Sequence, residues 1–404
     1  MSGRPGLSAS LLAVALVASA GCRSGSAAPG PPTTGGPSTP SPTVSSTTSP
    51  SPPLSCVDEV FGEMSEKQRV GQLFLLGLAD DRLGTAEAAA IKAHHFGSVW
   101  FIATTTEGAE EVRGVAEQVQ NQATARSTGR VRFFVAANQE GGLIQALRGP
   151  GFSTIPSAVD QGIMPPSELR AEATEWGREL SAAGVNMNFA PVMDVVPAGT
   201  DSQNQPIGAL HREYGHDPTT VAREGSAFLR GMTRARVATS AKHFPGLGRV
   251  VGNTDVTAGV ADNVTTPDDP DLMPFGRAVR DGVPFVMVAL ATYTKIDPDH
   301  LAAFSPTVIG LLRDQLGFDG VVLSDDLGET KAVADIAPAD RAIDFLQAGG
   351  NMIISKTLDP AVEMARALVS KAASDPSFRA LVDDAALRVL RAKDSFGLLP
   401  CSGD

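Results

Sequence analysis

Several features are scarce or absent in this chain of 404 residues. It has 3 cysteines and 6 histidines, and neither type recurs at the short spacings that metal sites use, so no metal site is expected. The net charge is -12 and the sequence has no basic cluster, which argues against a nucleic-acid partner. No glycine-rich G-x-G-x-x-G turn follows the first expected strand, so neither a dinucleotide nor another cofactor is expected.

The first 22 residues resemble an export signal. Arg4 precedes an apolar run from Leu11 to Val17 that is too short to span a membrane. Ser19 to Cys22 resembles a bacterial lipobox, which implies that Cys22 is lipidated and anchors an exported protein to the extracellular face of the cell membrane. A plain secretory signal is the alternative. Residues 23–54 are almost wholly Pro, Ser, Thr and Gly and are expected to form a disordered tether.

Two further cysteines mark the ends of the region expected to fold, residues 55–404. Cys56 opens this region and Cys401 closes it, and outside the cytosol such a pair is a disulfide candidate. If the two thiols pair, the ends of the domain must touch, as they do in a closed barrel. Two unrelated terminal thiols are the alternative.

Strands and helices are expected to alternate between the two cysteines. Amphipathic stretches predict helices at Pro166–Ala183, Pro218–Ala235, Asp271–Asp281 and Ser305–Leu316. Runs rich in Val, Ile, Leu and Phe predict eight strands: Gly71–Leu78, Gly97–Ile102, Val131–Asn138, Val185–Ala190, Val237–His243, Phe285–Leu290, Gly320–Ser324 and Asn351–Ser355. This α/β pattern favours a single TIM-type (β/α)8 barrel, with a doubly wound open sheet as the alternative.

Polar residues follow several of the predicted strands. Lys242 and His243 end the fifth strand, just before a Gly/Pro loop that could approach a ligand closely. Asp325 directly follows the apolar run of the seventh strand, where an unpaired carboxylate would be costly. Taken singly, Glu140 and Asp194 are better interpreted as loop caps or solvated charges. Because a barrel brings the carboxyl ends of its strands together, these residues predict one site suited to hydroxyl groups.

Six ordered motifs occur between about Ser65 and Phe396. They are Asn138-Gln-Glu-Gly-Gly, Asn188-Phe-Ala-Pro-Val, Ile207-Gly-x-x-x-Arg212-x-Tyr-Gly-x-Asp217-Pro218, Lys242-His-Phe-Pro-Gly, Leu316-Gly-Phe-Asp-Gly320 and Ser324-Asp-Asp-Leu327. Together they resemble glycoside hydrolase family 3, and most closely its single-domain bacterial β-N-acetylglucosaminidase branch. The resemblance implies a retaining, exo-acting β-glycosidase on a (β/α)8 barrel, with β-N-acetylhexosaminidase activity on cell-wall or other amino-sugar glycosides.

The resemblance also implies roles for individual residues. Asp325 matches the carboxylate nucleophile of the family, and Arg212, Lys242 and His243 match residues that hold sugar hydroxyls or the acetamido group. The substrate-binding candidates are Asn138, Arg148, Asp194, Arg212, Lys242 and His243.

The chain departs from the family pattern at four places. Asn138 replaces an Asp, Ala146 replaces an Arg although Arg148 is near, and the His usual after the sixth strand is missing. Most importantly, the family's Asp-x-His pair, whose His protonates the leaving group, is replaced by Asn253-Thr254-Asp255.

Two hypotheses follow from these departures. In the first, the protein is an enzyme in which Asp255 is the acid/base and Asp325 the nucleophile, because two carboxylates of opposed pKa are the general glycosidase solution. In the second, it is a wall-tethered carbohydrate-binding protein that kept the cleft and lost efficient turnover.

Overall fold

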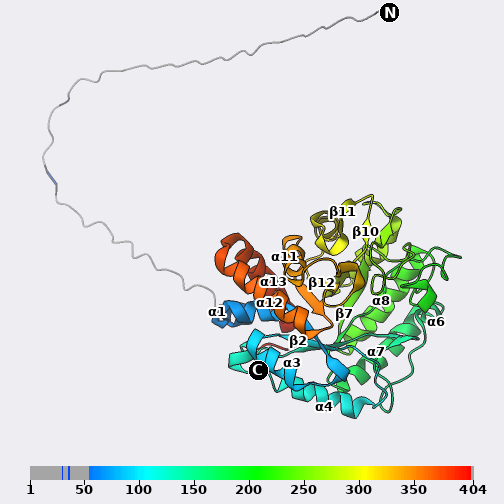
Figure 1. The fold of residues 1–404 in the computed structure, drawn as a ribbon, viewed down its shortest axis with the longest axis horizontal. Coiled ribbons are helices and arrows are strands. Elements are labelled where there is room, and N and C mark those ends of the chain that lie inside the picture. The colour runs from blue at the N-terminus through cyan, green and yellow to red at the C-terminus, as the bar shows by residue number, and fades with distance from the viewer. Residues whose placement is uncertain (1–29, 31–34, 37–53, 402–404) are drawn as a thin grey trace, which may run out of the picture. The chain divides into compact units, whose positions relative to one another are not determined.

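The computed structural model describes residues 30, 35–36 and 54–401. The expected signal peptide, the lipidation candidate Cys22 and nearly all of the tether at 23–54 lie outside the described residues. Within residues 54–401, eight parallel strands close into a barrel in the order β1-β13-β12-β9-β7-β6-β3-β2, and helices surround it (Figure 1). The predicted (β/α)8 barrel is therefore confirmed, and the open sheet is excluded.

All eight predicted strands are present: six are shorter than predicted, β7 is shifted by one residue, and β12 extends two residues further, to Asp326. The barrel strands are β1 Phe74–Leu78, β2 Ser98–Phe101, β3 Phe134–Ala137, β6 Met187–Asn188, β7 Ala238–Phe244, β9 Phe285–Val288, β12 Val321–Asp326 and β13 Met352–Ser355. β6 is the shortest because side-chain amides replace part of its backbone pairing. Asn186 Oδ1 accepts the amide of Val135 at 2.8 Å, and Asn188 Oδ1 accepts that of Gln139 at 3.0 Å.

Two small sheets lie outside the barrel. β4 Gln139–Gly141 pairs with β5 Ile144–Gln145, and β11 Asp297–Leu301, β10 Thr292–Tyr293 and β8 Ala261–Asp262 form a three-stranded sheet. Both sheets follow the carboxyl ends of barrel strands, so they lie at that end of the barrel.

The helices pack around the barrel. They are α1 Cys56–Glu63, α2 Glu66–Gln72, α3 Thr85–His94, α4 Ala109–Gln120, α5 Ala125–Thr128, α6 Ala158–Gly162, α7 Pro166–Ala182, α8 Pro218–Arg234, α9 Met273–Arg280, α10 Pro306–Gly310, α11 Pro338–Gln347, α12 Leu358–Ser374 and α13 Pro376–Ser395. α8 begins at an N-cap, since Asp217 Oδ1 accepts the amides of Thr219 and Thr220 at 3.0 Å. The Asp217-Pro218 motif is thus a helix start, in agreement with the capping preference of Asp and the place of Pro at the first turn.

The C-terminal helix α13 contributes to the end of the barrel opposite the strands' carboxyl ends. Lys393 is fully buried, and its Nζ donates to Gln72 Oε1 and to the Gly97 carbonyl at 2.7 Å each. Burial lowers the pKa of Lys393 well below its ordinary value. These contacts join α13 to the residues just before β1 and β2, so the C-terminal helix helps to hold the first strands in place.

The two terminal cysteines are bonded to each other. The Cα atoms of Cys56 and Cys401 lie 5.8 Å apart across a sequence separation of 345 residues. The predicted disulfide is therefore present in the structure, and it joins the two ends of the barrel domain.

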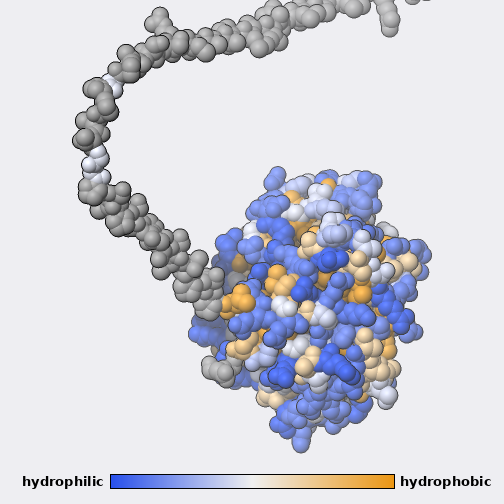
Figure 2. All heavy atoms as spheres, turned by 90° about the vertical axis from the view of Figure 1, so that its left-hand side faces the viewer, coloured by the Kyte–Doolittle hydropathy of each residue, from blue (hydrophilic) through white to orange (hydrophobic). Residues whose placement is uncertain are grey.

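Figure 2 shows one face of the surface. On the face shown in Figure 2, hydrophilic residues dominate and hydrophobic residues are scattered among them, which needs no special explanation. Among the described residues, no helix combines the length and apolar character needed to cross a membrane.

Candidate active site

A cavity of about 670 Å³ opens at the carboxyl ends of the barrel strands. This volume is within the usual range for small-ligand sites. Its wall is built from strand ends, with Trp100 of β2, His243 of β7, Met287 of β9 and Asp325 of β12 among the lining residues. Of the predicted site residues, the cavity is lined by Asn138, Arg212, Lys242, His243, Asp255 and Asp325.

Three charged side chains form a buried cluster on one wall. Arg212 donates to both carboxylate oxygens of Glu140, from Nε at 2.9 Å and from Nη2 at 2.8 Å. Lys242 Nζ lies 2.6 Å from Glu140 Oε1. The side chains of Glu140 and Lys242 are only 4% and 2% exposed, so these two groups are shielded from water and each needs the opposite charge beside it.

The pKa values of the cluster follow from burial and from the ion pairs. Burial alone would raise the pKa of Glu140, but the Arg212 guanidinium and the Lys242 ammonium lower it to about 2. Burial would lower the pKa of Arg212, yet the Glu140 carboxylate raises it above its ordinary value. Burial lowers the pKa of Lys242, and Glu140 opposes this shift. Glu140 is therefore ionised and neutralises one of two cations.

Asn138 completes this wall. Its Oδ1 accepts a hydrogen bond from Lys242 Nζ at 2.8 Å. Because an amide is neutral, the Asn that replaces the family's Asp leaves Glu140 as the carboxylate that pairs with Lys242. One donor of the ammonium thus goes to Asn138 and another to Glu140, which fixes the position of Lys242 beside the cavity.

Asp194 supports the site from behind and does not line the cavity. It is fully buried, and its Oδ2 lies 2.8 Å from His243 Nδ1. Its Oδ1 accepts the backbone amides of His243 at 3.1 Å and Leu247 at 2.9 Å. The oxygens of Asp194 therefore orient the ring and the following loop, and its contact with substrate stays a prediction. With Nδ1 held by Asp194, Nε2 is the ring nitrogen of His243 left for a ligand.

Arg148, the other predicted substrate-binding residue outside the cavity lining, bonds to backbone carbonyls. Its Nε donates to the Gln145 carbonyl at 2.9 Å and its Nη2 to the Gly142 carbonyl at 2.8 Å. Arg148 is not among the lining residues of the cavity. Its guanidinium braces the β4–β5 hairpin and does not take the place of the Arg that Ala146 replaces.

Two adjacent carboxylates on β12 have different surroundings. Asp326 Oδ1 accepts the amides of Gly328 and Lys356 at 2.8 Å each, and its Oδ2 accepts that of Glu329 at 3.1 Å. Asp325 accepts the Asp326 amide at 2.8 Å on Oδ1. Asp326 therefore organises backbone, whereas Asp325 is the carboxylate of the pair that can offer an oxygen to a ligand.

Electrostatics set Asp325 apart. Burial raises its pKa above the ordinary value of 3.8, His243 counteracts this shift, and Asp255 adds to it. The charge of Asp255 therefore affects the protonation of Asp325. Since a strongly perturbed carboxylate in a cleft is a marker of functional sites, Asp325 is the leading candidate for chemistry.

Asp255 reaches the cavity from the loop after β7. The Lys331 amide donates to the Asp255 carbonyl and the Ala332 amide to the Thr254 carbonyl, both at 3.1 Å. Asn253 Oδ1 accepts the Asp255 amide at 3.0 Å. The side chain of Asp255 is exposed, so the closed, apolar surroundings expected of a proton donor are not present in this arrangement of the loop.

Sequence reasoning undervalued two residues of the site. Glu140 was interpreted as a loop cap, although two buried cations in one predicted site require a counter-charge. Trp100 was treated only as part of a strand, yet it lines the cavity and its ring packs edge-on against Phe189 with centroids 5.6 Å apart. An aromatic residue at a strand end was the available signal, because sugars commonly stack on such rings.

Residues 65–392 match the Glycosyl hydrolase family 3 N terminal domain. The structure of a β-N-acetylhexosaminidase from Beutenbergia cavernae DSM 12333 is similar, with 49% sequence identity and a TM-score of 0.80. The match covers 82% of this chain and 98% of the relative. A family 3 β-N-acetylglucosaminidase from Paenibacillus sp. str. FPU-7 is 27% identical with a TM-score of 0.75, over 83% of this chain and 63% of that one.

A β-hexosaminidase from Methylococcus capsulatus is also similar. It is 33% identical over 267 residues, which cover 62% of this chain and 75% of the relative. The chain therefore belongs to glycosyl hydrolase family 3 and is a glycoside hydrolase.

Proposed function

We propose that the protein is a retaining, exo-acting β-N-acetylhexosaminidase that removes terminal amino sugars from cell-wall or related glycosides. The observation that carries this proposal is the shared cavity of Asp325 and Asp255, faced by a wall of fixed hydrogen-bond donors. Relatives named for this activity support the choice of sugar. No cofactor is required by this chemistry.

In the proposed mechanism, Asp325 is the nucleophile. One carboxylate oxygen attacks the anomeric carbon while the glycosidic C–O bond breaks, which gives a covalent glycosyl-aspartate. The leaving-group oxygen takes a proton from Asp255. A water molecule then gives its proton to Asp255 and attacks the anomeric carbon, and the Asp325 carboxylate is released with net retention.

The wall formed by Asn138, Arg212 and Lys242 would hold the sugar during both steps. Arg212 and Lys242 can only donate hydrogen bonds, whereas Asn138 can donate and accept, and His243 Nε2 accepts when the ring is neutral and donates when it is protonated. Their positions are fixed by Glu140 and Asp194, so little reorganisation is needed when substrate binds. A site built to pair with polar substituents rejects sugars that lack them.

Asp255 would act after a movement of its loop. A carboxyl group in water is ionised at neutral pH and cannot donate a proton, so the exposed side chain must approach the sugar to become a competent acid. Substrate binding would exclude water from this side of the cavity. The glycines of the loop, Gly252 and Gly259, provide positions at which the backbone can adjust.

The experiment that tests this function is a screen of aryl β-glycosides that compares N-acetylglucosamine with glucose at one leaving group. The proposal expects a large preference for N-acetylglucosamine, and β-configured sugar as the first product by NMR. First release of the α-anomer would refute retention. Binding of N-acetylglucosamine without turnover would support the carbohydrate-binding hypothesis, which the similarity to hydrolases does not favour.

We also propose that the protein is exported and anchored through lipidated Cys22. The lipobox-like sequence and the following Pro/Ser/Thr-rich segment support this proposal. In cells fed a clickable fatty acid, the protein should become labelled and partition with membranes. Cys22→Ser should abolish both properties, and unchanged labelling of this variant would contradict the assignment.

A further inference from the structure

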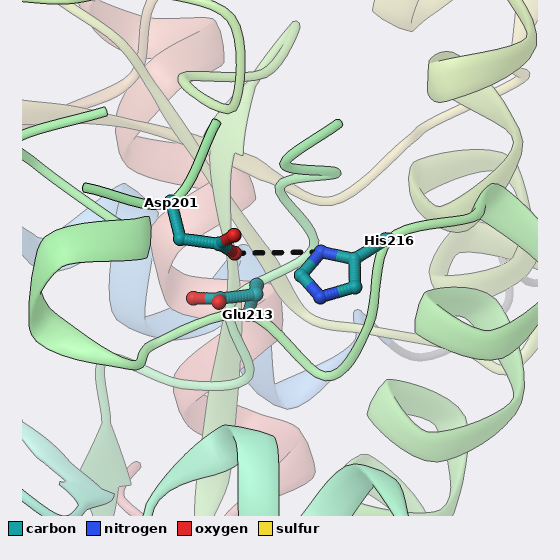
Figure 3. A group of neighbouring side chains, drawn as sticks. All are labelled: Asp201, Glu213 and His216. Carbon is teal, nitrogen blue, oxygen red and sulfur yellow. Dashed lines mark ion pairs between the residues drawn. The ribbon is translucent and has the colours of Figure 1, made fainter. Parts of the chain in front are cut away.

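A second group of ionisable side chains lies outside the cavity. Asp201 belongs to the long loop after β6, and Glu213 and His216 belong to the segment that leads into α8. Their spacing in sequence does not resemble a metal motif. The fold brings the three side chains together beside one another (Figure 3).

The three side chains converge on a small volume. Each offers one ligand atom, and these atoms all lie within 4.8 Å of one another. His216 Nδ1 is 3.5 Å from Asp201 Oδ1 and 3.1 Å from the Val196 carbonyl oxygen. In Figure 3 the carboxylates of Asp201 and Glu213 lie next to each other with the His216 ring beside them.

The loop that carries Asp201 is held close to this segment by packing. A Cβ atom at Gly208 would lie 2.7 Å from both Cα and the carbonyl oxygen of Asp201, so glycine permits the contact. The Gly208 turn leads directly to Arg212 and Glu213. The positions of Asp201 and Glu213 are therefore fixed by the backbone as well as by their side chains.

Glu213 gives an independent reason to expect a ligand. The residue is 1% exposed, and its Oε2 is buried without a hydrogen-bond partner among the described residues. A buried carboxylate oxygen beside a second carboxylate requires either a proton or a cation.

We propose that Asp201, Glu213 and His216 bind one divalent transition-metal ion, with Zn²⁺ as the best match. One imidazole nitrogen and two carboxylate oxygens suit Zn²⁺, whereas Ca²⁺ and Mg²⁺ prefer oxygen ligands alone. Three protein ligands leave a fourth tetrahedral position for water. The side chains of Asp201 and His216 are 36% and 44% exposed, so the ion can enter from solvent and a chelator can remove it.

The ion would have a structural role. Glu213 directly follows Arg212, the cavity residue that pairs with Glu140. An ion between Glu213, Asp201 and His216 would tie the loop after β6 to the segment that presents Arg212. The metal site itself does not depend on the proposed glycosidase activity, and its test therefore measures binding.

The test uses the untagged full chain after chelator treatment, titrated with Zn²⁺ in a calorimeter. We expect one Zn²⁺ per chain at this site. His216→Ala and Glu213→Gln should each weaken binding by more than the ~10- to 100-fold that loss of an outer-shell partner causes. His300→Ala is the matched control, because His300 also pairs with an aspartate, Asp297, at 3.0 Å and is exposed. It should bind Zn²⁺ as the wild type does.

Thermal unfolding supplies a second readout, in which each variant is compared with itself with and without Zn²⁺, so a difference in baseline Tm between variants does not affect the result. Zn²⁺ should raise the Tm of the wild type and of His300→Ala, and should leave the Tm of His216→Ala and Glu213→Gln unchanged. Absence of Zn²⁺ binding by the wild type would overturn the proposal. Equal binding by wild type, His216→Ala and Glu213→Gln would also overturn it, since the ion would then be held elsewhere.

Discussion

The two carboxylates proposed for catalysis lie in regions of opposite character. Asp325 ends a barrel strand and faces a wall in which the ion-paired Glu140 and Lys242 are buried. Asp255 is exposed on a loop whose next residue, Val256, is 75% exposed. In the proposed mechanism, a barrel strand fixes Asp325, the group that attacks. A loop carries Asp255, the group whose surroundings must change during the reaction.

The largest effect is expected from removing the fixed carboxylate. Asp325→Asn should lower kcat/KM on an aryl N-acetylglucosaminide by about 10⁴-fold or more, as loss of an essential nucleophile does in other enzymes. Asp326→Asn is the matched control, because Asp326 caps backbone amides and should mainly affect the Tm. An equal loss of kcat/KM in both variants, with equal Tm values, would contradict the distinction between the two residues.

The loop side of the comparison is tested by Asp255→Ala. Loss of activity should be about 10²- to 10⁴-fold for poor leaving groups and small for activated ones, because activated leaving groups need no proton. Asn253→Ala, which removes the side-chain acceptor of the Asp255 amide, should reduce activity evenly across the series. An even loss for Asp255→Ala as well would mean that Asp255 only shapes the loop.

The coupling between the two regions is tested by pH. Asp325 must be ionised to attack, so activity is present above its folded pKa and is lost as the pH falls through it. Because Asp255 contributes to the raised pKa of Asp325, Asp255→Asn should move the acid limb of kcat/KM to lower pH. An acid limb that stays in place would show that the two carboxylates do not interact.

Protonation of Glu140, in the buried charged cluster, is expected to have a smaller effect, and this effect is on stability. The folded pKa of Glu140 is about 2, below its ordinary value of 4.5, so its stabilisation is present above pH 4.5 and is lost as the pH falls towards 2. A pKa difference of that size corresponds to roughly 3 kcal/mol. Denaturant unfolding should show this loss in the wild type and not in Glu140→Gln, whose unfolding free energy should already be reduced at neutral pH. Parallel pH profiles would refute the ion-pair account.

The smallest effect on catalysis is expected from the disulfide, because neither Cys56 nor Cys401 lines the cavity. Replacing both with Ser should leave kcat/KM unchanged. It should lower the unfolding free energy by at most about 5 to 6 kcal/mol, from the loop-closure entropy of a long loop. Two free thiols in a non-reducing peptide map of the wild type would contradict the pairing.

The sequence was sufficient to predict the barrel and the residues at its strand ends. Apolar runs report burial, and a closed barrel then brings the ends of distant strands together. It was insufficient for Asp194 and Arg148, because the direction of a side chain at a strand end depends on the loop that follows. Asp194 turns towards His243, and Arg148 turns towards backbone carbonyls of its own hairpin.

Ion pairs between residues far apart in the chain could not be predicted from the sequence either. Glu140 and Arg212 are separated by 72 residues, and nothing local in either segment indicates that one neutralises the other. Asp201 is closer in sequence to Glu213 and His216, but it meets them only through the packing of a loop against Gly208, which the sequence does not indicate. In both cases the fold creates the electrostatic environment that gives the residues their chemistry.

The central claim is that Asp325 forms a covalent bond to the sugar. The most direct measurement is mass spectrometry of the protein after incubation with a slow fluorinated N-acetylglucosaminyl donor, followed by peptide mapping. The account predicts one glycosyl adduct per chain on the peptide that contains Asp325, and none in Asp325→Asn. Turnover of the donor without an adduct, or an adduct on another carboxylate, would contradict it.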